Sequence, residues 1–152
     1  MRRGFTLIEL LVVVGILGIL AATLLVTINP LAQIQKSNDA QRKGDLESVQ
    51  RALELYYNDN GSYPATLNWG NAWTPYINKL PKDPVSTYSF VYFSTGQAYY
   101  LYAHLQRGSS DTQSCNSGNA CSGFSSGISG FPNSSACGAV CNYGVTSPNV
   151  SP

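Results

Sequence analysis

Residues 4–28 have the sequence GFTLIELLVVVGILGILAATLLVTI, a stretch in which Glu9 is the only ionisable side chain. As a helix, the 24 residues 5–28 would rise about 36 Å, more than the roughly 30 Å hydrocarbon core of a membrane. Two arginines at positions 2 and 3 precede the stretch, and basic residues hold the nearer end of a membrane helix in the cytoplasm. We therefore expect one membrane-spanning helix over residues 5–28, with the rest of the chain outside the cytoplasm.

Three interpretations of this stretch differ in how they treat Gly4 and Glu9. A secretory signal peptide cleaved near Ala21-Ala22 would have a shorter apolar run and a small residue where Leu20 stands. A plain membrane anchor explains the length and the orientation, but a lone carboxylate in a membrane helix costs about 2–3 kcal/mol, and such residues are usually functional. The third interpretation explains both Gly4 and Glu9, and it rests on a resemblance to known proteins.

The run GFTLIE at residues 4–9, followed by a long apolar segment, resembles the class III signal of type IV pilins and type II secretion pseudopilins. The resemblance implies that prepilin peptidase, a membrane enzyme, cuts between Gly4 and Phe5 on the cytoplasmic side and methylates the new N-terminus at Phe5. It also implies that Glu9 meets the N-terminus of a neighbouring subunit and sets the assembly register. Pairing of Glu9 with the amine of Phe5 in the same chain, one helical turn away, remains the alternative.

Charged residues are few and unevenly placed along the chain. They make up 11% of the residues and leave a net charge of +1, so no basic surface argues for a nucleic-acid partner. Three of them lie in residues 1–30, twelve in residues 31–83 and two in residues 84–152. This distribution predicts an apolar anchor, a charged middle and a neutral polar exterior, and it argues against a uniformly solvated cytosolic enzyme.

Residues 29–60 are expected to form the amphipathic second half of the long helix. Pro30 predicts a kink near its start, because proline removes a helix hydrogen bond and clashes with the preceding turn. Gly61 is expected to end the helix. Apolar side chains recur at helical spacing on one face, and these are Leu46, Val49, Leu53 and Tyr56.

Residues 61–105 are predicted to form a loop followed by a β-hairpin. The first part, residues 61–84, has the glycines and prolines of a loop, with one short helical turn expected around residues 71–77. Two β-prone runs follow at residues 88–93 and 97–105. The sequence thus predicts an α+β fold, in which a long N-terminal helix, first transmembrane and then amphipathic, packs on a small antiparallel β-sheet.

Residues 106–152 are expected to be a loop region that contains all four cysteines. Of these 47 residues, 12 are Ser, 7 are Gly and 5 are Asn, which leaves too few apolar side chains for a core of their own. The cysteine spacing does not match a zinc site, whereas disulfides would hold such a loop in an exported head. Four cysteines allow three connectivities, and we favour the local one over a crossed one, with Cys115 joined to Cys121 and Cys137 joined to Cys141.

No catalytic arrangement is evident in the sequence. The sole histidine, His104, falls in a predicted strand with no acid or thiol near it in the sequence. The glycines of the tail are not followed by a helical pattern, as those of a phosphate-binding loop would be. We expect a protein that is not an enzyme.

Further motifs extend the resemblance to about residues 1–105. The segments ALELYY at 52–57, NGSYP at 60–64 and LPKDP at 80–84 look like the major pseudopilin of type II secretion. This implies a pilin-like subunit with a leader at residues 1–4, which polymerises with its own copies into a helical filament. Its other implied partners are prepilin peptidase and a pilus or secretion assembly platform. The precursor would cross the inner membrane once with its head outside, and the mature form would lie in an extracellular or periplasmic filament.

Two functions fit this resemblance. We place first a structural subunit of a type IV pilus-like filament, which the Ser/Gly-rich tail and its weak set of calcium ligands favour. The alternative, favoured by the head motifs, is a major pseudopilin that forms a short periplasmic piston. Major pseudopilins of this kind hold calcium in the loop after the sheet, through carboxylates and backbone carbonyls. Asp111 is the only acid in residues 106–152, so no cofactor is expected and Asp111 is a weak calcium candidate.

Overall fold

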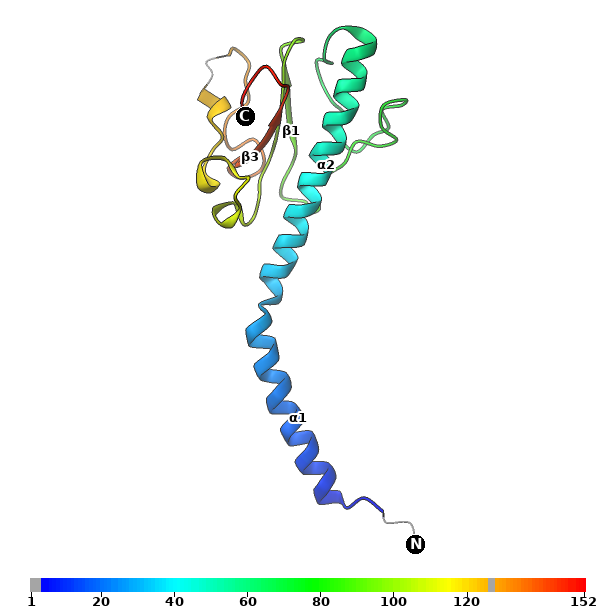
Figure 1. Ribbon diagram of the computed structural model, residues 1–152, viewed down its shortest axis with the longest axis vertical. Coiled ribbons are helices and arrows are strands. Elements are labelled where there is room, and N and C mark those ends of the chain that lie inside the picture. The colour runs from blue at the N-terminus through cyan, green and yellow to red at the C-terminus, as the bar shows by residue number, and fades with distance from the viewer. Residues whose placement is uncertain (1–3, 126–127) are drawn as a thin grey trace. The chain divides into compact units, whose positions relative to one another are not determined.

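The computed structural model describes residues 4–125 and 128–152, and the chain divides between Ile34 and Gln35 into two compact units (Figure 1). The first unit carries helix α1, Leu7–Ile28. Helix α2, Pro30–Asn60, lies mostly in the second unit, which also contains a β-sheet and the C-terminal tail. The predicted α+β fold is confirmed.

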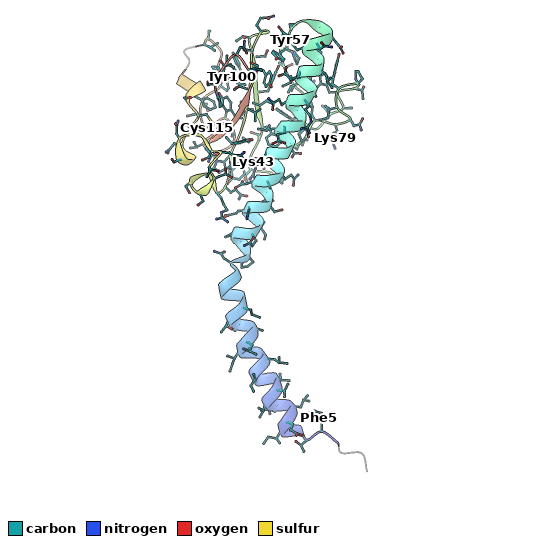
Figure 2. All side chains as sticks on the ribbon, viewed as in Figure 1. Phe5, Lys43, Tyr57, Lys79, Tyr100 and Cys115 are labelled. Atoms are coloured by element: carbon teal, nitrogen blue, oxygen red, sulfur yellow. A yellow bond between two sulfur atoms is a disulfide. The ribbon has the colours of Figure 1, made fainter. Side chains whose placement is uncertain are left out.

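Helix α1 exposes every side chain that is described along it, residues 7–24 (Figure 2). Within the described residues, it is the one helix long and apolar enough to cross a membrane. The aliphatic side chains of residues 7–24 lie on its surface, whereas most helices in proteins are stabilised by the packing of an apolar face. An exposed apolar surface of this size needs lipid or neighbouring copies of the chain to cover it.

The helical backbone is interrupted at Asn29, next to the proline from which a kink is expected. Asn29 is left-handed, with φ 44° and ψ 75°, and Pro30 is the first residue of α2. The Asn29 Oδ1 accepts a hydrogen bond from the backbone N–H of Ala32 at 3.3 Å. Because proline has no N–H for the ladder of α1 and disfavours helical backbone in the residue before it, one helix ends and the next begins at this pair.

The predicted apolar stripe of α2 lies in the core of the head. Tyr56, at the end of this stripe, is half-buried, and its ring centroid lies 5.4 Å from that of Trp73. The helix ends at Asn60, and Gly61 follows with φ +71°, a conformation that favours glycine. Leu46, Val49 and Leu53 of the stripe are buried, and Ala52, which was not among the predicted residues, is buried beside them.

Three antiparallel strands in the order β1-β2-β3 form the sheet of the head. Strand β1 spans Val91–Ser94 and β2 spans Tyr99–Ala103, so the predicted hairpin is present with shorter strands. Strand β3, Tyr143–Thr146, comes from the tail and pairs with β2, with Val145 opposite Leu101. The sequence did not predict this third strand.

Both faces of β2 are covered, because all five of its side chains are buried. Tyr99 and Leu101 pack in the core that includes the stripe of α2. Tyr100 and Tyr102 belong to a second core on the other face, where the tail lies across the sheet from α2 (Figure 1). The tail therefore contributes to a core as well as forming loops, and it does so through Cys121, Phe124, Ile128, Phe131, Cys137 and Cys141.

The remaining segments of the head are short turns. The helical turn expected around residues 71–77 is instead a turn closed by an isolated bridge, in which the Ile77 N–H donates to the Trp73 carbonyl at 3.0 Å. In its described residues the tail has short 3-10 turns at η1 Gly108–Ser110 and η3 Ser122–Ser125. Between them, η2 Cys115–Gly118 is an irregular turn, because Asn116 and Ser117 have left-handed backbone with φ 45° and 55°.

Leu53 and Leu55 form a matched pair on α2, since the first is fully buried and the second is 57% exposed. Leu53→Ala should lower the free energy of unfolding of the head by about 2–5 kcal/mol, because it removes buried methyl groups and leaves a cavity. Leu55→Ala should change it by less than about 0.5 kcal/mol. Urea titrations followed by the fluorescence of Trp69 and Trp73 measure both values, and equal losses would contradict the assigned buried face.

Candidate functional site

Helix α1 begins with reciprocal hydrogen bonds between Thr6 and Glu9. The Thr6 hydroxyl accepts from the Glu9 N–H at 3.3 Å. In return, Glu9 Oε2 accepts from the Thr6 N–H at 3.0 Å and from the Thr6 hydroxyl at 2.8 Å. This capping box satisfies backbone groups that the first turn of a helix leaves without partners. It also holds the Glu9 carboxylate at the start of the helix, one turn from Phe5.

The surface around Glu9 is otherwise apolar. Phe5 precedes the helix, and its side chain is 85% exposed. In the uncleaved chain the nitrogen of Phe5 is an amide bonded to Gly4, so it offers no charge, and the hydrogen bonds from Thr6 stabilise the carboxylate. A carboxylate in an apolar layer needs such bonds or a cation. The hollow that contains Phe5 and Glu9 is also lined by Ile8, Val12 and Val13.

In the head, Arg42 lies at the centre of a buried ion cluster with Asp39 and Asp83, here named the Arg42 cluster. The Arg42 Nε and Nη2 donate to the two oxygens of Asp83 at 2.7 and 2.8 Å, and Nη1 donates to Asp39 Oδ1 at 2.8 Å. The planar guanidinium matches the two oxygens of a carboxylate. Since Asp83 belongs to the LPKDP motif, the cluster attaches that motif to α2.

Backbone groups complete the Arg42 cluster. The Asp39 carboxylate accepts the N–H groups of Gln106 and Arg107, both at 2.9 Å, which fixes the segment after β2. Asp83 Oδ1 accepts the N–H of Val85 at 2.9 Å. Burial disfavours the charge of Arg42, but its hydrogen bonds and charge pairing with Asp83 and Asp39 outweigh burial and raise the pKa of Arg42 further. The guanidinium therefore stays charged inside the head.

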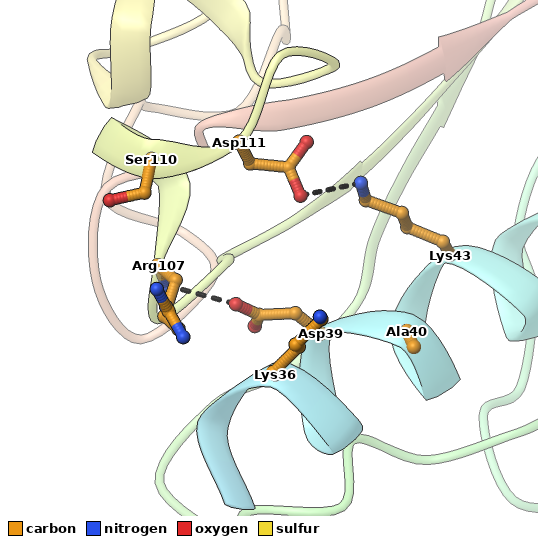
Figure 3. Close-up of a pocket in the computed structure, with 7 residues that line it drawn as sticks. All are labelled: Lys36, Asp39, Ala40, Lys43, Arg107, Ser110 and Asp111. Carbon is orange, nitrogen blue, oxygen red and sulfur yellow. Dashed lines mark hydrogen bonds and ion pairs between the residues drawn. The ribbon is translucent and has the colours of Figure 1, made fainter. Parts of the chain in front are cut away.

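Asp111, the weak calcium candidate, faces a lysine (Figure 3). Lys43 Nζ lies 2.6 Å from Asp111 Oδ2. Although burial alone would raise it, the pKa of Asp111 is held below its usual value by the hydrogen bond from Lys43 and that from the Gln113 N–H, with the lysine charge adding to them. Within residues 4–125 and 128–152, no three His, Cys, Asp or Glu side chains gather where they could hold a metal. The residues around Asp111 do not fit calcium.

The other residues singled out from the sequence have structural contacts. His104 Nδ1 lies 2.8 Å from the carbonyl oxygen of Val140, to which it donates, and its ring packs against Tyr88 with centroids 4.7 Å apart. The four cysteines form the local pairs that the sequence favours, with Cα–Cα distances of 4.8 and 5.4 Å, and the pairs are Cys115–Cys121 and Cys137–Cys141.

Sequence patterns missed the Arg42 cluster, although its spacing carries a signal. Asp39 and Arg42 precede Leu46 at intervals of three and four residues, which continues the buried face of α2 toward its N-terminus. A search for apolar residues at helical spacing passes over these two charged residues and assigns them to a solvated face. A buried charge needs a partner, and Asp83 in LPKDP supplies one 41 residues away.

Two protein-family models match the chain. Residues 1–25 match the prokaryotic N-terminal methylation motif, and residues 29–121 match type II secretion system (T2SS), protein G. The chain belongs to the type II secretion system protein G family. The protein G match ends at residue 121, so the pair Cys137–Cys141 and strand β3 lie beyond it.

Several curated relatives carry the same name. Type II secretion system core protein G of Pseudomonas aeruginosa is 34% identical over 120 residues, 67% of this chain and 82% of the relative. The core protein G of Klebsiella michiganensis is 32% identical over 146 residues, 86% of this chain and 87% of the relative. That of Escherichia coli is 38% identical over 100 residues, 55% of this chain and 66% of the relative. No solved structure matches the chain significantly.

Membership of the protein G family confirms the resemblance to prepilins and pseudopilins. It also corrects the order of the two functional hypotheses. The sequence placed the pilus-like filament first and the major pseudopilin second, whereas the matches to protein G favour the pseudopilin.

Replacement of Arg42 tests the Arg42 cluster. Arg42→Ala should lower the free energy of unfolding of the head by about 3–5 kcal/mol, because the carboxylates of Asp39 and Asp83 would stay buried without their cation. Arg51→Ala, on an exposed position of the same helix, is the matched control and should cost less than about 0.5 kcal/mol. Chemical unfolding followed by near-ultraviolet circular dichroism gives both numbers. An Arg42→Ala head as stable as the Arg51→Ala head would refute the assigned role.

Proposed function

We propose that this protein is the major pseudopilin of a type II secretion system, a structural subunit that polymerises into a short helical filament in the periplasm. The observation that carries the proposal is the presence in one chain of a methylation motif at residues 1–25 and a protein G match at residues 29–121. The uncovered apolar surface of α1 supports it, because an assembled fibre would cover that surface.

The subunit begins as an inner-membrane precursor with its head in the periplasm. Prepilin peptidase cleaves between Gly4 and Phe5 and methylates the amine of Phe5. Cleavage removes Arg2 and Arg3, which orient the membrane helix, and it creates a cationic amine close to the carboxylate of Glu9. The secretion assembly platform then moves the subunit from the membrane into the filament.

Charge pairing and close packing favour the filament over the membrane. Transfer of α1 from lipid to a bundle of helices yields little hydrophobic free energy, because lipid tails are as apolar as leucine side chains. Glu9 supplies a specific interaction when its carboxylate meets the Phe5 amine of a neighbouring subunit, since a paired ion is tolerated where a lone one is not. Gly15 and Gly18 have open space around them and let a neighbouring helix approach closely.

One of the two arguments for a pilus-like surface fibre came from the composition of residues 106–152. Those residues contribute β3 and part of the second core beside Tyr100 and Tyr102, so their composition reflects packing in the head as well as exposed loops. With that argument weakened, the protein G relatives favour a filament that serves secretion.

Glu9→Gln tests the register role with little change to the start of α1, because a glutamine side chain still accepts the hydrogen bond from the Thr6 N–H. We expect normal cleavage after Gly4 and loss of most filaments, since the amine of the neighbouring subunit would face no carboxylate. Mass spectrometry of membranes and electron microscopy of released filaments measure the two outcomes. Glu9→Asp keeps the charge and should retain more filaments. A normal filament yield from Glu9→Gln would contradict the role.

Deletion of this chain in its host separates the secretion function from the pilus function. We expect exported proteins that normally cross the outer membrane to accumulate in the periplasm, while long surface fibres persist. Fractionation of cells and microscopy of their surfaces measure this, and expression of the intact chain should restore secretion. Loss of surface fibres with normal secretion would instead support a type IV pilus subunit.

A further inference from the structure

The Lys43 ammonium attaches residues 111–113 of the 106–118 loop, which follows β2, to α2. Lys43 Nζ donates to Asp111 Oδ2 at 2.6 Å (Figure 3) and to Gln113 Oε1 at 2.8 Å. It also lies 5.6 Å from the centroid of the Tyr143 ring on β3, within the range of a cation–π contact. The loop thus holds a cation between two side-chain oxygens and an aromatic face, and this cation belongs to the chain itself.

Backbone carbonyl groups near Asp111 are engaged by hydrogen bonds within the loop. The Ser114 hydroxyl lies 2.6 Å from the Gly108 carbonyl oxygen and 2.8 Å from the Asp111 carbonyl oxygen. The same two oxygens accept the N–H groups of Asp111 at 3.1 Å and of Ser114 at 3.3 Å. A metal ion would have to displace these bonds to gain carbonyl ligands.

A neutral amide joins the two ends of the loop. Asn142 Oδ1 accepts the Leu105 N–H at 2.6 Å, and Nδ2 donates to the carbonyl oxygens of Leu105 at 3.0 Å and of Gly118 at 3.3 Å. The fit around Asn142 is tight, since a Cβ atom at Gly108 would lie 2.3 Å from its amide nitrogen. These contacts need no added ion.

A disulfide closes the far end of the loop. Cys115 is joined to Cys121, and the Cys115 N–H donates to the Asn142 carbonyl oxygen at 2.8 Å. The Cys121 N–H donates to the carbonyl oxygen of Cys141 at 3.1 Å, and Cys141 belongs to the second disulfide. The loop is therefore covalently constrained and connected to the segment that leads into β3.

Calcium binding would need a different set of side chains. Calcium takes six to eight oxygen ligands and prefers several carboxylates, whereas Asp111 is the only acid in residues 106–152. The nearby ammonium of Lys43 would also repel a divalent cation.

We propose that the Lys43 ammonium is a covalently tethered substitute for the calcium ion expected in major pseudopilins. The cation that organises the loop comes from α2 instead of from solution. Asp39 holds the start of the loop, and Asn142 and the two disulfides hold its far end. The head then folds without a divalent cation, and its stability depends on oxidation of its cysteines, which an oxidising compartment maintains. This inference concerns the fold of the head and is independent of filament assembly.

The mature full-length chain in detergent micelles allows a direct test. Both tryptophans and all ten tyrosines lie between residues 56 and 143, so their fluorescence reports the head alone during thermal unfolding. The midpoint with calcium chloride and the midpoint with the chelator EGTA should agree within about 1 °C, because a bound ion would otherwise stabilise the folded state. A reducing agent should lower both midpoints. A midpoint several degrees higher with calcium than with EGTA would overturn the proposal.

A second test separates the ammonium from the rest of the side chain. Lys43→Met keeps an unbranched apolar side chain near Tyr143 and removes the charge, and it should lower the midpoint by about 5 °C. Lys36→Met, at an exposed lysine that lines one hollow together with Lys43 and Asp111 (Figure 3), is the matched control and should lower it by less than about 1 °C. Equal midpoints for Lys43→Met and the unaltered chain would also overturn the proposal.

Discussion

The Arg42 guanidinium joins three parts of the head that are far apart in the sequence. It binds Asp83 in the segment between α2 and the sheet, and it binds Asp39, which in turn holds the backbone after β2. Two buried carboxylates without this cation would be strongly destabilising. Residues 61–90 contain no helix and no named strand. The rigid, bidentate contact through Asp83 attaches them to α2, together with the buried Leu80 and the hydrogen bond from Tyr63 to Glu54.

The layers of the head follow from the two apolar faces of β2. One face carries Tyr99 and Leu101, which α2 covers, and the other carries Tyr100 and Tyr102, which the tail covers. The tail is too polar to form a core alone. Its few apolar residues and its two disulfides can still complete a core, because β2 already supplies the aromatic surface of Tyr100 and Tyr102. Four groups then hold the 106–118 loop, namely the Asp39 carboxylate, the Lys43 ammonium, the Asn142 amide and the Cys115–Cys121 bond.

Features encoded by short segments could be predicted from the sequence, whereas features that need distant partners could not. The apolar helix, the GFTLIE motif, the end of α2 before Gly61 and the hairpin of β1 and β2 each depend on neighbouring residues. Strand β3 pairs with a strand about 40 residues earlier, and no local pattern in Ser/Gly-rich sequence identifies such a partner. One argument for a pilus came from that same tail composition. Composition alone does not show that Tyr100 and Tyr102 form an apolar face that the tail covers.

The central claim is that α1 enters a filament after the leader has been removed and the new N-terminus methylated. The most direct measurement is the intact mass of the protein in filaments purified from cells that express the native chain. We predict a chain that begins at Phe5, carries an N-methyl group and retains two disulfides. Assembled protein that still begins at Met1 would contradict the account.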